Sequence, residues 1–298
     1  MNSVLALVAA LAVGAPGDVP RECDQRTASA RSNVWERAKT PGVRAYCAKL
    51  ASAAARLLDV PPDVERVVAL ADDALALLPA RGAPHAMKGR AYVATGRLDE
   101  ALSSFGAAER SEPDSVAHGR TLREFARALL LADKTDAARP RYLRLATELD
   151  GFTVAERAGI QIEAGLVMAT TDPIDSESAL SFFVRAQEDS DFEMASAAAF
   201  FERLVRSRRK DFEPPRPRPG PEPDPRAVFA PERLGLLFGP VGQRESLAAS
   251  ALALESRDAA AARALWQEYV QVAHKRCEPC RAHAQGRITS GPPAAKTK

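Results

Sequence analysis

Near its C-terminus the 298-residue chain gathers two histidines and two cysteines in a single short stretch. His274, Cys277, Cys280 and His283 follow one another with two residues between each pair. Cys thiolates and His imidazoles are common ligands of Zn²⁺. Zinc ligands usually come from two separated segments, however, and four neighbours in sequence reach one tetrahedral centre with difficulty. A metal site is therefore an alternative for this segment, and our main expectation is that the chain holds no metal and no other cofactor.

The two cysteines of this segment also admit a redox interpretation. Cys277 and Cys280, with Pro279 between them, are similar to the Cys-x-Pro-Cys motif of thioredoxin-like oxidoreductases. The sequence that follows Cys280 is too short for that fold. A c-type haem needs His directly after the second cysteine, where this chain has Arg281. A structural disulfide is the interpretation that we favour, and a redox or metal-binding protein remains the alternative function.

The segment 1–15 predicts export from the cytoplasm. Residues 4–15 form an apolar run of the length of a signal-peptide core, which is too short to span a bilayer. Because no Lys or Arg precedes this run, a retained N-terminal anchor is the alternative. We expect a periplasmic or cell-envelope location, with no transmembrane segment in the mature chain.

Export makes disulfides the expected state of the cysteines. The chain has four, Cys23, Cys47, Cys277 and Cys280, an even number in an oxidising compartment. The simplest pairing joins Cys23 to Cys47 and Cys277 to Cys280. The first pair would tie the N-terminal extension to the first helix pair.

A second set of candidate functional residues is a row of arginines. Arg56, Arg90 and Arg127 occupy corresponding positions in successive sequence repeats, and Arg120 and Arg123 extend the stripe on the helix of Arg127. Guanidinium groups bind carboxylates in a bidentate manner. The row therefore predicts a groove for a protein or peptide with an acidic segment or a C-terminal carboxylate. The alternative is that these arginines decorate an exposed helix face.

The elements that would position these arginines are helix pairs. Residues 82–115 carry Gly89, Tyr92, Ala101, Phe105, Ala108 and Pro113 at a characteristic spacing, with a turn at residues 96–100. Small residues let two helices approach, aromatic residues fill the space between them, and the proline ends the second helix. This segment resembles a tetratricopeptide repeat. The resemblance implies an all-α fold, a TPR-like array of stacked helical hairpins, and protein binding on the face of the first helices.

Degenerate copies of the pattern flank this segment. Upstream, a shift of one repeat length places Ala55, Leu58, Val67, Ala71, Ala74 and Pro79 on the same framework. Downstream, a slightly larger shift, with extra residues in the loop after Pro113, places Ala126, Leu129, Ala138 and Tyr142 on it, with Pro140 inside a helix. A fourth unit covers residues 158–189, with Ala179, Phe183 and Ala186 in its second helix, and a further helix is expected at 191–208.

These patterns divide the chain into six segments. We expect a signal peptide or anchor at 1–15, an extension and first helix at 16–47, and TPR-like repeats at 48–210. A proline-rich linker follows at 211–226, then a C-terminal helical segment at 227–286 that turns near residue 257. Residues 287–298 are rich in Gly, Pro, Ala and Lys and predict a disordered tail.

Composition and charge narrow the function. Aromatic residues make up only 6% of the chain, which suits Ala-rich helices better than sheets. A net charge of +2 lacks the electrostatic footprint of a nucleic-acid binder. No Ser-His-Asp order, phosphate-binding glycine loop or metal-binding His pair is present, so a hydrolase of the envelope is disfavoured. We expect a non-enzymatic protein-interaction scaffold.

Overall fold

The computed structural model describes residues 23, 41–188, 190, 192–209, 230–273 and 277–290. Within these ranges the chain forms twelve α-helices and two short 3-10 helices and no strand, which confirms the all-α prediction. It divides into two compact units. Unit 1 comprises residues 1–128 and 147–152, and unit 2 comprises residues 129–146 and 153–298.

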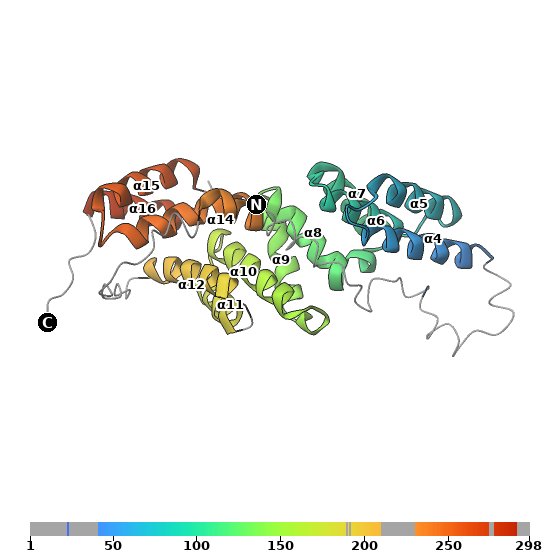
Figure 1. The fold of residues 1–298 in the computed structure, drawn as a ribbon, viewed down its shortest axis with the longest axis horizontal. Helices are drawn as coiled ribbons and strands as arrows, with labels where there is room; N and C mark the ends of the chain where they lie inside the picture. The colour runs from blue at the N-terminus through green and yellow to red at the C-terminus, as the bar shows by residue number, and fades with distance from the viewer. Residues whose placement is uncertain are drawn as a thin grey trace. The chain divides into compact units, whose positions relative to one another are not determined.

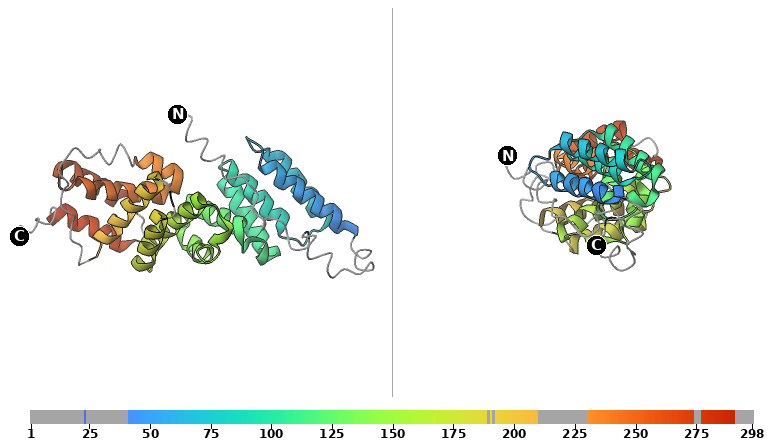
Figure 2. Two further views of the ribbon diagram at one scale, coloured as in Figure 1. Left: turned by 60° about the horizontal axis from the view of Figure 1, so that its bottom comes forward. Right: turned by 90° about the vertical axis from the view of Figure 1, so that its right-hand side faces the viewer.

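Unit 1 is built from helices that pack against their neighbours in sequence. It contains α4 (Pro41–Leu57), α5 (Val64–Leu77), α6 (Ala83–Ala94), α7 (Leu98–Ser111), η2 (Pro113–Val116), most of α8 (Gly119–Leu131) and η3 (Leu149–Gly151). The most extensive contacts join α4 to α5 and α6 to α7, and α5 also contacts α6. Figures 1 and 2 show α4 and α5 side by side. Short turns join these partners, so each pair is a helical hairpin.

The α6–α7 hairpin closes on a glycine that faces an aromatic ring. A Cβ at Gly89 would lie only 2.8 Å from the Phe105 ring. Phe105 is fully buried and stacks on Phe125, with 4.9 Å between ring centroids. Ala101 and Ala108 on α7 are also fully buried, and Pro113 starts η2 just after α7 ends. Small residues and one buried ring thus make the contact that the spacing predicted.

Tyr92, the other aromatic residue of the motif, is half-buried. It packs against the core cluster of α4, α5 and α6, and the Arg97 guanidinium lies 4.5 Å above its ring.

The turn that ends α6 recurs at the end of α8. Gly96 has φ 73° and Asp133 has φ 59°, both in the left-handed region. The next residue closes the same backbone bond in each turn, from Arg97 N to the Tyr92 carbonyl and from Lys134 N to the Leu129 carbonyl. A left-handed residue with this bond is a common way to end a helix. The downstream shift that aligns Ala126 and Leu129 with the motif therefore describes a real correspondence in backbone geometry.

A glutamate that caps a helix start also recurs in unit 1. Glu112, just after α7, accepts a bond from Gly82 N at the start of α6, at 3.1 Å. Glu148 accepts from Gly119 N at the start of α8, at 3.2 Å. A carboxylate there satisfies an otherwise unpaired donor and complements the helix dipole. In both cases a glutamate that lies about 30 residues further along the chain is bonded to the backbone at the start of a helix.

The first helix of the upstream copy has a different register from the predicted one. Ala55 and Leu58 were expected in the core, but Ala55 is exposed and Leu58 is 45% exposed. The buried residues of α4 are Tyr46, Leu50 and Ala53. The turn after α4 covers residues 58–63, whereas the turn after α6 covers only 95–97. The longer turn moves the core positions of α4 towards its N-terminus. The second helix was predicted correctly, because Val67, Ala71 and Ala74 are fully buried.

Unit 2 contains the remaining helices. They are the end of α8, then α9 (Thr135–Leu145), α10 (Val154–Thr170), α11 (Ser176–Glu188), α12 (Phe192–Ser207), α14 (Pro231–Leu254), α15 (Ala259–Val272) and α16 (Glu278–Ser290). The expected Pro140 lies inside α9, and α12 matches the helix expected at 191–208.

The α10–α11 hairpin repeats the glycine–aromatic contact of unit 1. A Cβ at Gly165 would lie 2.6 Å from the Phe183 ring, which is fully buried and packs on Phe201 of α12. Ala179 and Ala186 on α11 are fully buried. The predicted fourth unit is thus a helical hairpin. Gly165 is the small residue of its first helix, which the sequence analysis did not identify.

The C-terminal helices of unit 2 dock on its earlier helices. α14 contacts α10, α12 and α15, and α15 contacts α16. α14 is interrupted at Phe238 and Gly239, where the backbone leaves the helical region. Beyond this break, Arg244 binds Asp133 through both terminal guanidinium nitrogens, with Nη1 at 2.9 Å. The elements that flank the proline-rich segment therefore belong to one compact unit.

The last helix corrects the predicted limit of the tail. Residues 287–290 were expected in a disordered tail, but α16 continues to Ser290. Arg287 faces inward and binds Glu255 at 3.1 Å, which explains why the helix extends past this point. The targeting segment 1–15, the linker 211–226 and residues 291–298 lie outside the described residues. In the part of the chain that the structure describes, no helix has both the length and the apolar character needed to cross a bilayer.

Candidate functional site

The structure separates the predicted arginine row into different environments. Arg90, Arg120 and Arg123 are mostly buried, with 9%, 9% and 7% of their surface exposed, and Arg127 is half-buried. Arg123 lies with its guanidinium 6.0 Å from the centre of the Phe152 ring. These side chains therefore do not form a row of solvent-exposed guanidinium groups along a groove.

Arg90 binds a carboxylate that belongs to the chain itself. Its Nε lies 2.9 Å from Glu124 Oε2, so the ion pair connects α6 to α8. Glu124 lies one repeat length further along the chain, on the first helix of the next predicted copy. The sequence predicted a carboxylate of a binding partner at this position, but the carboxylate that Arg90 contacts is internal, and the bond joins two helices.

Arg56 does not belong to the row. It lies in the last turn of α4, its side chain is 55% exposed, and it pairs with Asp59 at 3.3 Å. The long turn after α4 shifts the register of this helix, so a residue one repeat length before Arg90 falls at the helix end. The predicted alignment of Arg56 with Arg90 and Arg127 was wrong for this reason.

All four cysteines form the disulfides of the simplest pairing. Cys23 is bonded to Cys47, and Cys277 to Cys280. Both C-terminal cysteines are completely buried. Within the described residues no group of three or more His, Cys, Asp or Glu could hold a metal ion, and His274 lies outside those residues. The observed bond supports the structural interpretation of this segment.

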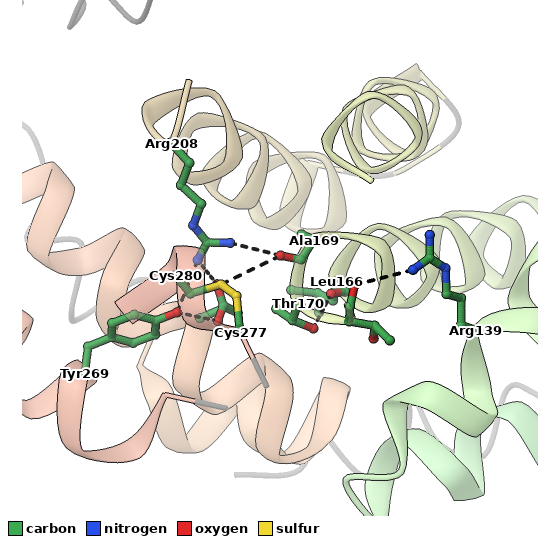
Figure 3. The surroundings of a disulfide bond; sticks show 10 residues. Arg139, Leu166, Ala169, Thr170, Arg208, Tyr269, Cys277 and Cys280 are labelled. Atoms are coloured by element: carbon green, nitrogen blue, oxygen red, sulfur yellow. Dashed lines mark hydrogen bonds and ion pairs between the residues drawn. A yellow bond between two sulfur atoms is a disulfide. The ribbon is translucent and has the colours of Figure 1, made fainter. Parts of the chain in front are cut away.

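The C-terminal disulfide lies against a buried polar cluster (Figure 3). Cys280 Sγ is 3.9 Å from the carbonyl oxygen of Ala169, near the end of α10. Arg208 donates to the same carbonyl from Nη1 at 3.2 Å. The other terminal nitrogen of Arg208 binds Glu245 on α14 and Tyr269 on α15. One guanidinium thus connects the end of α12 to three other helices of unit 2.

Arg208 stays charged despite its burial. Burial is the largest influence and disfavours the charge of Arg208, but Glu245 and Tyr269 together outweigh it, so the pKa of Arg208 is raised. Tyr269 donates its hydroxyl to Glu245 at 2.8 Å. Burial and then the Glu245 charge raise the pKa of Tyr269, which keeps the hydroxyl protonated. The arrangement is a hydrogen-bonded network that holds helices together.

His283, the second histidine of the C-terminal motif, lies against Ser207 and Trp266. Its Nε2 lies 3.3 Å from Ser207 Oγ, and its ring packs edge-on against Trp266. Ser207 Oγ also lies 2.7 Å from the Leu204 carbonyl, so this carbonyl competes with His283 for the one proton of the hydroxyl.

We expect His283 to make the stability of unit 2 depend on pH. Burial, then Arg208 and Arg287, lower the pKa of His283 to about 3 from 6.5. Above pH 6.5 the imidazole is neutral in both states, and below it only the unfolded chain binds the proton. The free energy of unfolding should therefore fall by up to about 1.4 kcal/mol per pH unit as pH drops from 6.5 towards 4.5.

Urea unfolding of wild type and His283→Gln at several pH values measures this effect. Carboxylates titrate in the same window, so the informative quantity is the difference between the two chains. That difference should change with pH because only the wild type carries the imidazole. If the free energies of unfolding of the two chains changed with pH in parallel, His283 would not contribute to the pH dependence of stability.

A second buried network was not visible in the sequence. Glu255, at the end of α14, accepts from Trp266 Nε1 at 3.0 Å and from Arg287 at 3.1 Å. Burial raises the pKa of Glu255, and Arg287 opposes this shift. These residues come from three different elements and share no motif, so the packing of α14, α15 and α16 brings them together.

Comparison with known proteins identifies no relative of this chain. No family model matches the chain, and no significant match exists among curated proteins or solved structures.

Proposed function

We propose that the chain is an exported, non-enzymatic scaffold of the tetratricopeptide kind, which binds a protein or peptide in the bacterial cell envelope. The observation that carries this proposal is the glycine–phenylalanine contact that closes two separate hairpins. Gly89 meets Phe105 in α6–α7, and Gly165 meets Phe183 in α10–α11. Hairpins closed by a small residue and a ring are the units from which such arrays are assembled.

Other recurring features support the same proposal. The turns at Gly96 and Asp133 share their backbone bonds, and Glu112 and Glu148 cap helix starts in the same manner. Two disulfides agree with an oxidising location. The proposal therefore rests on local geometry that repeats along the chain.

Unit 1 is the better place for a partner. In unit 2 every residue from 158 to 170 of α10 is buried, because α9, α11, α12 and α14 all pack against this helix. In unit 1, α6 keeps a partly exposed face that includes His85, Lys88 and Val93. A partner held by first helices has room on α6 and none on α10. The arginine row supports an acidic partner less strongly, since Arg90 already binds Glu124.

Site-specific photo-crosslinking in the organism that encodes the chain tests this proposal. A photoreactive amino acid is placed at His85 or Val93 on α6, and as a matched control at Gln267 or Gln271, which are exposed on α15. We expect one discrete protein adduct in the envelope fraction from the α6 positions only. The identified partner should then bind purified chain with saturation in calorimetry. Equal labelling from α15, or no adduct and no binding, would contradict the proposal.

A further inference from the structure

The two disulfides of the chain differ in how deeply they are buried. Cys277 and Cys280, which form the C-terminal disulfide, are completely buried in unit 2. Cys23 and Cys47, which form the N-terminal disulfide of unit 1, are both half-buried. Thiol–disulfide exchange requires a thiolate to reach a sulfur atom, and exposed disulfides are the more easily reduced ones. The fold therefore protects the C-terminal disulfide and leaves the N-terminal disulfide open to exchange.

The N-terminal disulfide holds a residue from far upstream against the core of unit 1. Cys23 precedes Cys47 by 24 residues, and Cys47 belongs to α4. Both cysteines pack against the core cluster of Tyr46, Leu50 and Ala74. If the bond were broken, Cys23 would keep only this packing among the contacts of the described residues.

The same core cluster extends to the start of α6. Ala83, the first residue of α6, packs against it, and α4 also contacts α6 directly. The first turn of α6 is closed by a bond from Ala86 N to the Gly82 carbonyl at 3.0 Å. A change at the N-terminal disulfide therefore acts on a cluster that also supports the first turn of α6.

We propose that the N-terminal disulfide is a redox-sensitive switch whose reduction loosens the packing at the start of α6, while the C-terminal disulfide stays closed. One thiolate of a dithiol reductant attacks a sulfur of the bond and forms a mixed disulfide, and the other cysteine leaves as a thiolate and takes up a proton. The second thiol of the reductant loses its proton and displaces the first cysteine, which is protonated in turn. Two electrons and two protons thus pass from the dithiol, which becomes a disulfide, to Cys23 and Cys47.

This switch would regulate the helix that is proposed to hold a partner. Control of partner binding rests on the proposed function, because α6 is the helix assigned to the partner there. Reduction and loosening are properties of unit 1 alone, and both are measured without a partner. Failure of the photo-crosslinking experiment would therefore leave these two measurements unaffected.

Thiol labelling under native conditions tests the difference between the two disulfides. The full chain is treated with dithiothreitol, free thiols are trapped with iodoacetamide, and each cysteine is followed by peptide mass spectrometry. We expect Cys23 and Cys47 to be labelled at least about tenfold faster than Cys277 and Cys280. In urea that unfolds the chain, the ratio should fall below about threefold, because burial no longer protects the C-terminal pair. Equal rates in the native chain, or a ratio that urea leaves unchanged, would overturn the proposal.

Hydrogen exchange tests the effect on α6. The oxidised chain is compared with chain in which only the N-terminal disulfide has been reduced and alkylated. The double variant Cys23→Ser, Cys47→Ser, which cannot form the bond, shows whether the alkyl groups matter. Peptides that cover the first turn of α6 should exchange at least about threefold faster in both samples, and peptides from α15 in unit 2 should not change. Unchanged exchange at the start of α6, or equal acceleration in α15, would contradict the coupling.

Discussion

Replacing Arg208 with methionine is expected to lower the free energy of unfolding of unit 2 by about 3–5 kcal/mol, the usual effect of removing one partner of a buried ion pair. Arg208 is 9% exposed and Glu245 only 3% in their side chains. The substitution leaves the Glu245 carboxylate buried with Tyr269 as a remaining donor, and it removes a bond to the Ala169 carbonyl.

Denaturant unfolding measures this loss, with Arg206→Met as the control. Arg206 lies two positions earlier and its side chain is 51% exposed, so its loss should cost less than about 1 kcal/mol. Adding Glu245→Leu to Arg208→Met should recover part of the stability, because the unpaired charge is then gone. Equal effects of the two arginine variants would show that the network around the disulfide does not hold the helices together.

Replacing Gly165 with alanine should destabilise the chain although alanine favours helices. Alanine in place of a helical glycine normally stabilises by about 0.5–1 kcal/mol. At this position the new methyl would lie 2.6 Å from the ring of Phe183, which is completely buried and cannot swing away. We expect a net loss of about 1–3 kcal/mol from overpacking.

Gly286 provides the matched control for this prediction. It lies in α16, is exposed, and a Cβ there would meet no atom within 4 Å among the described residues. Gly286→Ala should therefore stabilise the chain slightly. Thermal and urea unfolding compare the two variants, and the same sign at both positions would rule out the close helix contact.

The two glycine–phenylalanine contacts show what the sequence can and cannot predict. Gly89 and Phe105 were recognised because the short turn at 95–97 keeps the motif spacing. Gly165 and Phe183 are further apart along the chain, since the turn at 171–175 between their helices is longer. The periodicity of each helix predicts which of its residues face the core. The length of the turn decides which glycine meets which phenylalanine, and this length cannot be read from a single sequence.

The charged residues were harder to predict than the core. Arg90 was predicted to bind the carboxylate of another protein, whereas the carboxylate that it contacts is Glu124 of its own chain, which nothing local in the sequence indicates. Arg208 and Glu245 are distant in sequence and meet only because α14 docks on α10 and α12. Periodicity predicts which helix face is buried, whereas the partner of a buried charge depends on tertiary packing. The disulfide pairing was predictable because the four cysteines fall into two groups along the chain, Cys23 with Cys47 and Cys277 with Cys280.

A double-mutant cycle between Gly165→Ala and Phe183→Leu tests most directly whether the helix pairs are joined through this contact. Urea unfolding of the two single variants and the double variant gives the coupling energy. We expect a coupling of about 1 kcal/mol or more, because a smaller side chain at position 183 makes room for the methyl at 165. The same cycle at Gly89 and Phe105 should give a similar value. Purely additive effects at both hairpins would contradict the account.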